Sequence, residues 1–398
     1  MVVARRASAQ PCDVVAGAAS SMGAIPRTGV RSLSSLDMAN TSHLSRWGAL
    51  AVAGALALAA CGGDDDDAAP IGTTADGLQA TQGDAEQGTI RVYSGRHYGV
   101  EHAFSQFTED TGINVQFLNG NDGELRERIV AEGDETLADV YLTVDAGNLA
   151  AAAAQGIFQP LESTVLDEAI PAEYRDADHL WFGLALRARS IVYTTDESRL
   201  PAGDVPQTYA ELADPKWDGR LCLRRAADAY QQSLIASLIA HDGYDATLEL
   251  VRGWVANAQI IPNDVALLET IAEGGCDVGI ANHYYLARQL DEDGDFPVAL
   301  TWADQAGRGV HINVSGGGVT KYADHPDLAR QFLEWLATDG QQVLVGENFE
   351  FPANPGVEPE QLLVDEFGTD FVRDSLNAAE MGTFNPDAVR LMDEAGYD

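Results

Sequence analysis

The chain has 398 residues and a formal net charge of −38 at pH 7, with 62 acidic against 24 basic side chains. Residues 1–60 hold five arginines and two aspartates, so the remainder is more acidic still. Such a charge repels nucleic acid and anionic membrane surfaces, which excludes a DNA or RNA partner.

The N-terminal region has the layout of a secretory signal. Residues 47–60 are uncharged and apolar, follow Arg46 and end in Leu58-Ala-Ala-Cys61. The stretch is too short to span a bilayer. Its end resembles the lipobox of bacterial lipoproteins, in which the cysteine is lipidated; a chance Ala-Ala-Cys in an alanine-rich chain is the alternative. We expect a leader over 1–60 (with Met38 as an alternative start), lipid on Cys61 and a flexible acidic linker over 61–87.

From residue 88 onward, short apolar runs alternate with amphipathic patterns, which is typical of an α/β fold. Strands are expected at residues 89–94, 114–118, 138–144, 187–193, 221–224, 278–281 and 309–314. Helices are expected at residues 100–107, 123–131, 231–240 and 327–337, with an alanine-rich helix that ends at 154. These are too many elements for one small layer, so two lobes are expected.

Two cysteines remain after Cys12 is assigned to the leader and Cys61 to the lipid. Cys222 and Cys276 each lie in a strand-like run. In an exported protein such a pair predicts a disulfide, and two buried free thiols are the alternative. A loop of this length, once closed, would stabilise the fold by about 4 kcal/mol in the chain-entropy model.

Four of the expected strand-to-helix turns carry side chains that bind hard cations. The pair Tyr284-Tyr285 stands where an apolar run ends and a helical pattern begins. Buried hydroxyls need partners, whereas phenolates are hard oxygen donors suited to Fe³⁺. An ordinary aromatic start of a helix is the alternative, and the neighbouring His283 is interpreted as a loop histidine. The other turns carry His97 and Tyr98, Asp145, and Tyr230.

Two weaker motifs are interpreted as structural. His97 and Glu101 have the spacing of two ligands on one helix face, but no second pair supports a zinc site. Glu101 is therefore interpreted as a charge in the first turn of a helix. The run Ser315-Gly-Gly-Gly lacks the features of a nucleophile elbow or a phosphate loop, so it predicts a glycine-rich strand end where the lobes cross.

Eight motifs appear in the same order as in bacterial ferric-iron-binding proteins, the solute-binding components of iron(III) ABC transporters. The resemblance covers residues 88 to about 358. It implies a two-lobed periplasmic-binding-protein fold (type II-like) with a hinge and an inter-lobe cleft. Lobe 1 would comprise residues 88–187 and 304–398, and lobe 2 residues 188–303. The motifs are SGRHY (94–98), LTVDAG (142–147), LWFGLALRAR (180–189), DPKWDGR (214–220), YQQS (230–233), NHYY (282–285), NVSGGGV (313–319) and NPGV (354–357).

The resemblance also implies a ligand set and partners. Carried over by position, the Fe³⁺ ligands are His97, Tyr98, Tyr230, Tyr284 and Tyr285. Some members of the wider family use an acidic ligand near Asp145 and a bound anion, which Arg187 or Arg189 would face. The expected protein is a monomer held at the cell envelope by lipid, serving an inner-membrane permease and its ATPase.

Two other functions are weighed against iron capture. A protein of the same fold that binds a polyamine, a phosphonate or an organic acid has no reason to keep three turn tyrosines and His97. A secreted metalloenzyme needs an open coordination position and a general base, and the phenol set offers no evident base. The sequence therefore predicts a transport protein and no enzyme.

Overall fold

The computed structural model describes residues 72–73, 78–81, 87–96 and 99–398, all within one compact unit, Asp64–Asp398. The expected leader and the expected lipid site at Cys61 lie outside these residues, as do His97 and Tyr98. Part of the segment expected to be linker belongs to the sheet instead. Leu78 is buried there, and the Thr81 hydroxyl hydrogen-bonds Thr108 at 2.8 Å.

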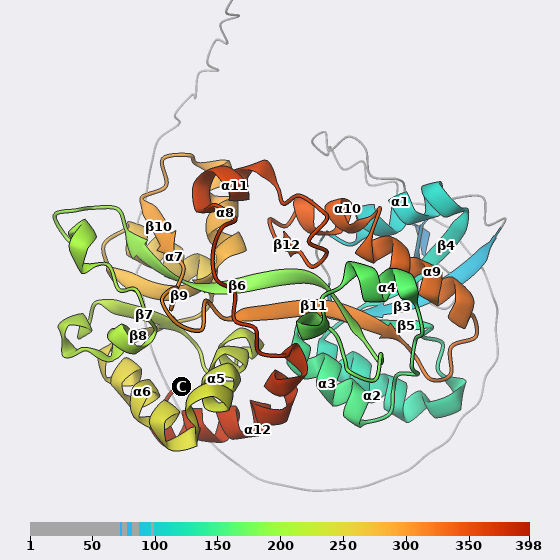
Figure 1. Cartoon of the computed structure of the whole chain (residues 1–398), viewed down its shortest axis with the longest axis horizontal. Helices are drawn as coiled ribbons and strands as arrows, with labels where there is room; N and C mark the ends of the chain where they lie inside the picture. The colour runs from blue at the N-terminus through green and yellow to red at the C-terminus, as the bar shows by residue number, and fades with distance from the viewer. Residues whose placement is uncertain (1–71, 74–77, 82–86, 97–98) are drawn as a thin grey trace, which may run out of the picture. The chain divides into compact units, whose positions relative to one another are not determined.

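The strands follow one continuous order, β1-β2-β4-β3-β5-β11-β6-β9-β7-β8, with β10 and β12 attached to β6 (Figure 1). Pairing is parallel between β3 and its neighbours β4 and β5, and between β7 and its neighbours β8 and β9. The strands are β1 (Gly72–Thr73), β2 (Gln79–Ala80), β3 (Gly88–Ser94), β4 (Ile113–Asn119), β5 (Val140–Thr143), β6 (Phe182–Thr194), β7 (Leu221–Arg224), β8 (Ala258–Ile261), β9 (Val278–Asn282), β10 (Val298–Thr301), β11 (Ile312–Val319) and β12 (Phe351–Pro352).

Helices follow most of the strands, which confirms the predicted α/β class. Every expected strand and helix has a counterpart, and β7 has the expected bounds. The α-helices are α1 (Glu101–Thr111), α2 (Asp122–Glu132), α3 (Ala146–Ala154), α4 (Thr164–Ala169), α5 (Ala229–Asp242), α6 (Tyr244–Asn257), α7 (Asp264–Ala272), α8 (His283–Glu292), α9 (Pro326–Ala337), α10 (Gln341–Gly346), α11 (Gln361–Phe367) and α12 (Ala378–Ala395). No described helix is long and apolar enough to cross a bilayer.

Strand β6 is shared between the two halves of the strand order. Its residues 182–188 pair with β11, and residues 189–193 pair with β9. The change of partner falls between Ala188 and Arg189. Arg187 and Arg189 stand two residues apart and therefore project from the same face of the strand, on either side of this change.

Close backbone packing explains the glycine run of β11. A Cβ at Gly316 would lie 2.1 Å from the Phe182 carbonyl oxygen, and one at Gly318 would lie 2.3 Å from that of Leu180. Any larger side chain would push β11 away from β6. The run lies in the second half of β11, which confirms that it belongs to a strand, and the crossing of the lobes there stays a prediction.

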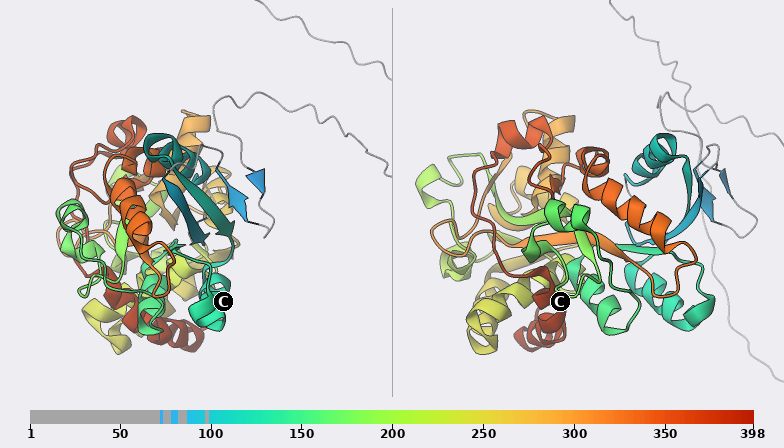
Figure 2. Two further views of the ribbon diagram at one scale, coloured as in Figure 1. Left: turned by 90° about the vertical axis from the view of Figure 1, so that its right-hand side faces the viewer. Right: turned by 45° about the vertical axis from the view of Figure 1, so that its right-hand side comes forward.

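The C-terminal helix α12 joins two hydrophobic cores. Ala378 and Met381 near its start belong to the core around β3, β4 and β5, whereas Leu391 and Met392 near its end belong to the core around β7 and β9. Figures 1 and 2 show α12 beside both α3 and α5. This amphipathic helix therefore covers apolar surface of both cores, and the assignment of residues 304–398 to lobe 1 stays a prediction.

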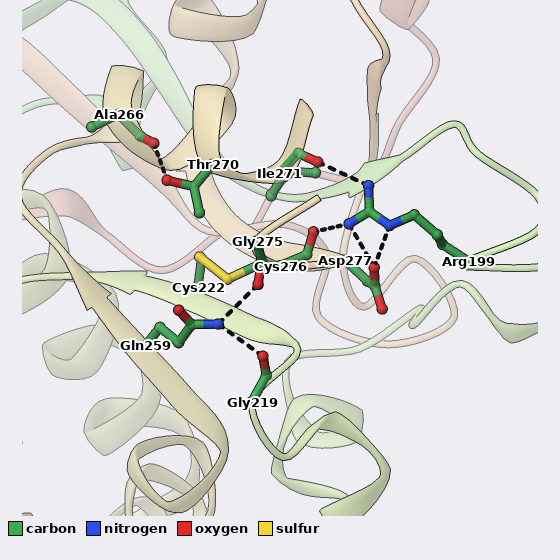
Figure 3. The surroundings of a disulfide bond; sticks show 10 residues. All are labelled: Arg199, Gly219, Cys222, Gln259, Ala266, Thr270, Ile271, Gly275, Cys276 and Asp277. Carbon is green, nitrogen blue, oxygen red and sulfur yellow. Dashed lines mark hydrogen bonds and ion pairs between the residues drawn. A yellow bond between two sulfur atoms is a disulfide. The ribbon is translucent and has the colours of Figure 1, made fainter. Parts of the chain in front are cut away.

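A disulfide links Cys222 of β7 to Cys276, which stands just before β9 (Figure 3). The predicted pairing is confirmed. Both cysteines are buried in a core with α7. Polar contacts hold the surrounding backbone: the Gln259 amide donates to the carbonyl of Gly219 at 2.8 Å and to that of Gly275 at 2.9 Å. The bond therefore closes a 54-residue separation at the strands that lead to the tyrosine turns.

Replacing both cysteines (Cys222→Ala with Cys276→Ala) should lower the free energy of unfolding by about 2–5 kcal/mol, because the unfolded chain loses a cross-link. Urea unfolding under oxidising conditions measures the difference. A reductant should lower the urea midpoint of the wild type and leave that of the double variant unchanged. Equal midpoints for the two oxidised proteins would contradict the stabilising role.

Candidate metal centre

Three of the candidate ligands stand at the first turns of two helices. Tyr230 is the second residue of α5, and Tyr284 and Tyr285 are the second and third residues of α8. Strand β9 leads directly into α8, and β7 ends shortly before α5. Because β7 and β9 are neighbouring parallel strands, their carboxyl ends share one edge of the sheet, where α/β folds place ligands.

The three phenols interact with one another. The ring centroids of Tyr284 and Tyr285 are 4.3 Å apart. Burial raises the pKa of Tyr285, and the Tyr230 phenol raises it further, while a hydrogen bond with Tyr284 and the charge of Arg224 oppose the rise. The Tyr285 phenol is therefore neutral at neutral pH in the absence of a cation. The Asn282 amide donates to the Tyr284 hydroxyl at 3.4 Å.

Guanidinium groups surround these rings. The Cζ atoms of Arg187 and Arg224 each lie 5.1 Å from the centroid of the Tyr230 ring. That of Arg288 lies 5.1 Å from the Tyr284 ring and 5.8 Å from the Tyr285 ring. Cations at such distances are attracted to the ring faces and favour the phenolate form. The site therefore has positive charge in place before any metal arrives.

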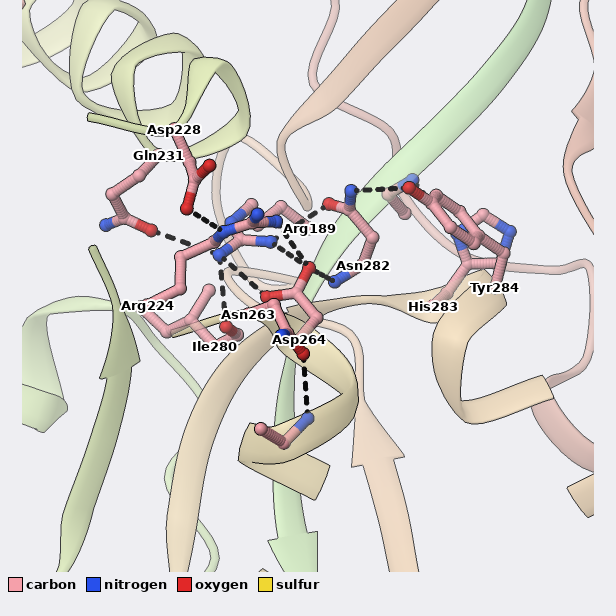
Figure 4. A network of polar contacts seen from close by, with 12 residues as sticks. Arg189, Arg224, Asp228, Gln231, Asn263, Asp264, Ile280, Asn282, His283 and Tyr284 are labelled. Atoms are coloured by element: carbon pink, nitrogen blue, oxygen red, sulfur yellow. Dashed lines mark hydrogen bonds and ion pairs between the residues drawn. The ribbon is translucent and has the colours of Figure 1, made fainter. Parts of the chain in front are cut away.

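A buried carboxylate holds two of the neighbouring arginines (Figure 4). Asp264, the first residue of α7, is fully buried and lies 2.9 Å from Arg189 and 3.1 Å from Arg224. Arg224 also pairs with Asp228 at 2.9 Å, two residues before Tyr230. This network ties the end of β7 to the start of α5 and thereby places Tyr230.

Arg189 is directed toward acceptors within the protein. Besides Asp264, its guanidinium donates to Asn282 Oδ1, to Gln231 Oε1 and to the Ile280 carbonyl, each at 3.2 Å. Arg189 of β6 thus links this strand to β9 and to α5. Its assignment to an anion stays a prediction.

Asp145 serves as the N-cap of α3. Its carboxylate accepts from the backbone N–H of Asn148 at 3.0 Å and from the side-chain amide at 2.9 Å. Burial raises the pKa of the nearby Asp122 to about 7, and the charge of Asp145 adds to the rise. Asp145 therefore has a structural role at the end of β5, which stands in the order of strands two places from β6.

Arg187 points to a second buried carboxylate. Its Nε lies 3.7 Å from Glu350, which is fully buried and also pairs with Arg96 at 2.6 Å. Arg96 and Gly99 are the residues on either side of His97 and Tyr98 in the sequence. The geometry of those two candidate ligands lies outside the described residues.

His283 is a buried helix-start residue, so its interpretation as a loop histidine is wrong. Its Nδ1 accepts from the Ala188 N–H at 3.2 Å, and its ring stacks on Phe351 with centroids 4.7 Å apart. Burial lowers its pKa to about 3, which keeps the imidazole neutral. Glu101 begins α1, as the helix-charge interpretation expects.

Within the part of the chain that the structure describes, no group of three or more His, Cys, Asp or Glu is arranged to hold a metal ion.

The sequence analysis missed three residues that surround the phenols: Arg288, Asp264 and Glu350. Arg288 had a local signal, since it lies one helical turn after Tyr284. Asp264 and Glu350 had none, because their arginine partners are distant in the sequence.

Comparisons with known proteins agree with this geometry. A family model described as bacterial extracellular solute-binding protein matches residues 97–343. Iron uptake protein A1 of Synechocystis sp. is 38% identical over 356 residues, which cover 87% of this chain and 94% of that protein. The Fe(3+)-binding periplasmic protein of Serratia marcescens is 29% identical over 325 residues, covering 80% and 93%.

Solved structures extend the likeness to the fold. A Trichodesmium protein (IdiA, FutA) in complex with iron and citrate has a TM-score of 0.73 and 38% identity, with 78% of this chain and 100% of that chain covered. The ferric binding protein from Campylobacter jejuni has a TM-score of 0.71 and 30% identity, with the same coverage. The resemblance and the fold class expected from the sequence are confirmed. The chain belongs to the family of bacterial extracellular solute-binding proteins.

Proposed function

We propose that this protein captures Fe³⁺ outside the cytoplasm and delivers it to the permease and ATPase of an ABC transporter. One observation carries the proposal: three phenols from two neighbouring strand ends meet beside three guanidinium groups. Relatives named for iron uptake and ferric-iron binding support it.

The cost of ionising the phenols selects the cation. Deprotonating one tyrosine of pKa about 10 at pH 7 costs about 4 kcal/mol, and three cost about 12 kcal/mol. The raised pKa of Tyr285 adds to this cost. Only a small, highly charged cation offsets it, and hard phenolate oxygens discriminate against softer divalent ions. Fe³⁺ meets both conditions.

The proposed ligands are His97, Tyr98, Tyr230, Tyr284 and Tyr285. The two groups come from distant parts of the chain, since His97 and Tyr98 follow β3, whereas the others follow β7 and β9. Binding that needs both groups is coupled to domain closure, because only a closed state completes the coordination shell. The permease would recognise that closed state.

Further parts of the proposal concern the surroundings of the metal. A synergistic anion would lie near Arg187, with Asp145 as an additional acidic neighbour. A monomer anchored by lipid at Cys61 at the outer face of the cytoplasmic membrane or in the periplasm would present the site to the permease. The division into lobes over 88–187 with 304–398 and over 188–303 belongs to the same proposal, with α12 shared between them.

An organic solute is the competing ligand. A polyamine would need free carboxylates, and a phosphonate or organic acid would need uncommitted arginines. Here Asp264 is held between two arginines, and Arg189 has four acceptors within the protein. The phenol cluster is the feature that such a ligand leaves unexplained.

Titrating the full chain with ferric citrate at neutral pH should produce a visible phenolate-to-iron charge-transfer band that saturates at one equivalent. The band should be lost in Tyr284→Phe with Tyr285→Phe, because both hydroxyl donors are removed. Tyr244→Phe with Tyr322→Phe, which changes two tyrosines outside the site, serves as the matched control. An organic solute that stabilises the protein while iron produces no band would overturn the proposal.

Iron affinity should fall as the pH falls. An ordinary tyrosine has a pKa of about 10, and that of Tyr285 is raised, so iron must displace a proton from each phenol that it binds. Binding is therefore favoured at high pH and opposed at low pH. With three phenols ionised, the logarithm of the affinity for free Fe³⁺ should drop by about three per pH unit below their pKa values. Competition against a chelator of known protonation between about pH 8 and about pH 4 measures the slope. A flat profile would contradict phenolate ligation.

A further inference from the structure

Three consecutive residues between α10 and β12 adjoin the arginines that surround the phenols. Asn348 and Glu350 are buried, with 5% and 0% of their surface exposed. Phe349 stands between them. None of the three lies in a strand-to-helix turn that holds a candidate ligand. None belongs to the motifs by which the sequence resembles ferric-iron-binding proteins.

The backbone of this segment has an unusual conformation. Phe349 has a φ of 54°, its N–H donates to the Gly346 carbonyl at 3.0 Å, and the Glu350 N–H donates to the Val345 carbonyl at 3.2 Å. These two bonds form a Schellman motif at the end of α10, whose left-handed position is usually occupied by glycine. A bulky residue there is strained and persists only when its surroundings hold it. The turn directs the side chains on either side into the protein.

Glu350 connects the segment between β3 and α1 to Tyr230. It pairs with Arg96 at 2.6 Å and lies 3.7 Å from Arg187, whose Cζ is 5.1 Å from the Tyr230 ring. Two buried guanidinium groups need a counter-charge, and Glu350 supplies it to both. Removing this charge would release Arg187 from its place beside Tyr230.

Asn348 makes the corresponding connection to the tyrosine pair. Its Oδ1 accepts from Arg288 at 3.0 Å, and Arg288 lies over the rings of Tyr284 and Tyr285. On its other side, the Asn348 amide is packed against Gly99, where a Cβ would lie 1.9 Å from Nδ2. Asn348 is thus held between the segment before α1 and helix α8.

We propose that Asn348–Glu350 is a positioning segment for iron binding. Glu350 holds the Arg187 guanidinium beside Tyr230, and Asn348 holds that of Arg288 over the tyrosine pair. The two cations offset the charge of the phenolates and fix the orientation of the rings when the metal binds. The inference rests on the proposed function and adds to it residues that act on Tyr230, Tyr284 and Tyr285 through the arginines beside them.

The test is Glu350→Gln, which keeps the size of the side chain and removes its charge. Iron affinity in citrate competition should fall about 10- to 100-fold, as it does when partners of metal ligands are changed. The charge-transfer band should also shift in energy or lose intensity, and iron should be released at higher pH. A purely structural role would lower the unfolding midpoint and leave the band of the bound iron unchanged.

Two further variants complete the experiment. Asp277→Asn is the matched control, because Asp277 also pairs with two arginines, Arg199 and Arg220, away from the phenols; its band should equal that of the wild type. Asn348→Ala decides the question if Glu350→Gln does not fold, since it leaves no buried arginine without its carboxylate. This inference alone would be overturned if the wild type binds iron and the folded variants keep the same charge-transfer band and the same iron affinity. A wild type that binds no iron would overturn the proposed function and this inference with it.

Discussion

Buried charge is the constraint on which this site depends. Phenols that ionise, as the proposed function requires, need positive charge nearby, and buried guanidinium groups in turn need carboxylates. In the structure, each of two buried carboxylates pairs with two arginines. Asp264 holds Arg189 and Arg224, and Glu350 holds Arg96 and Arg187.

Strand β6 brings these pairs together. Arg187 and Arg189 project from the same face, one on each side of the point where the strand changes partner from β11 to β9. One arginine therefore reaches Glu350 and the other reaches Asp264. A continuous strand between two cores thus connects the two halves and carries Arg187, one of the two arginines over the Tyr230 ring. Helix α12 adds a second connection, because its two ends belong to different cores.

The disulfide and the ion pairs around Asp277 stabilise the scaffold that presents the tyrosines. Cys222 lies in β7 and Cys276 precedes β9, so the bond joins the two parallel strands whose ends lead to Tyr230 and to Tyr284. A cross-link at this position limits the separation of those strands. The relative positions of the phenols then depend mainly on the first turns of α5 and α8.

Sequence reasoning succeeded where the signal is local. The strand-to-helix turn at Tyr284, the strand at residues 221–224 and the glycine run of β11 all follow from the residue types and their spacing over a few positions. The cysteine pair followed from counting and from the expectation of export. The prediction was wrong for His283 and for residues 78–81, and it contained no helix at α12, because burial in these segments depends on surfaces supplied by remote parts of the chain. The arginine and carboxylate partners around the phenols likewise come from distant parts of the chain. Residue types and short spacings therefore determined the turns on which the three tyrosines stand. The counter-charges around them were decided by the tertiary fold, since an ion pair between distant residues leaves no periodic pattern in a sequence.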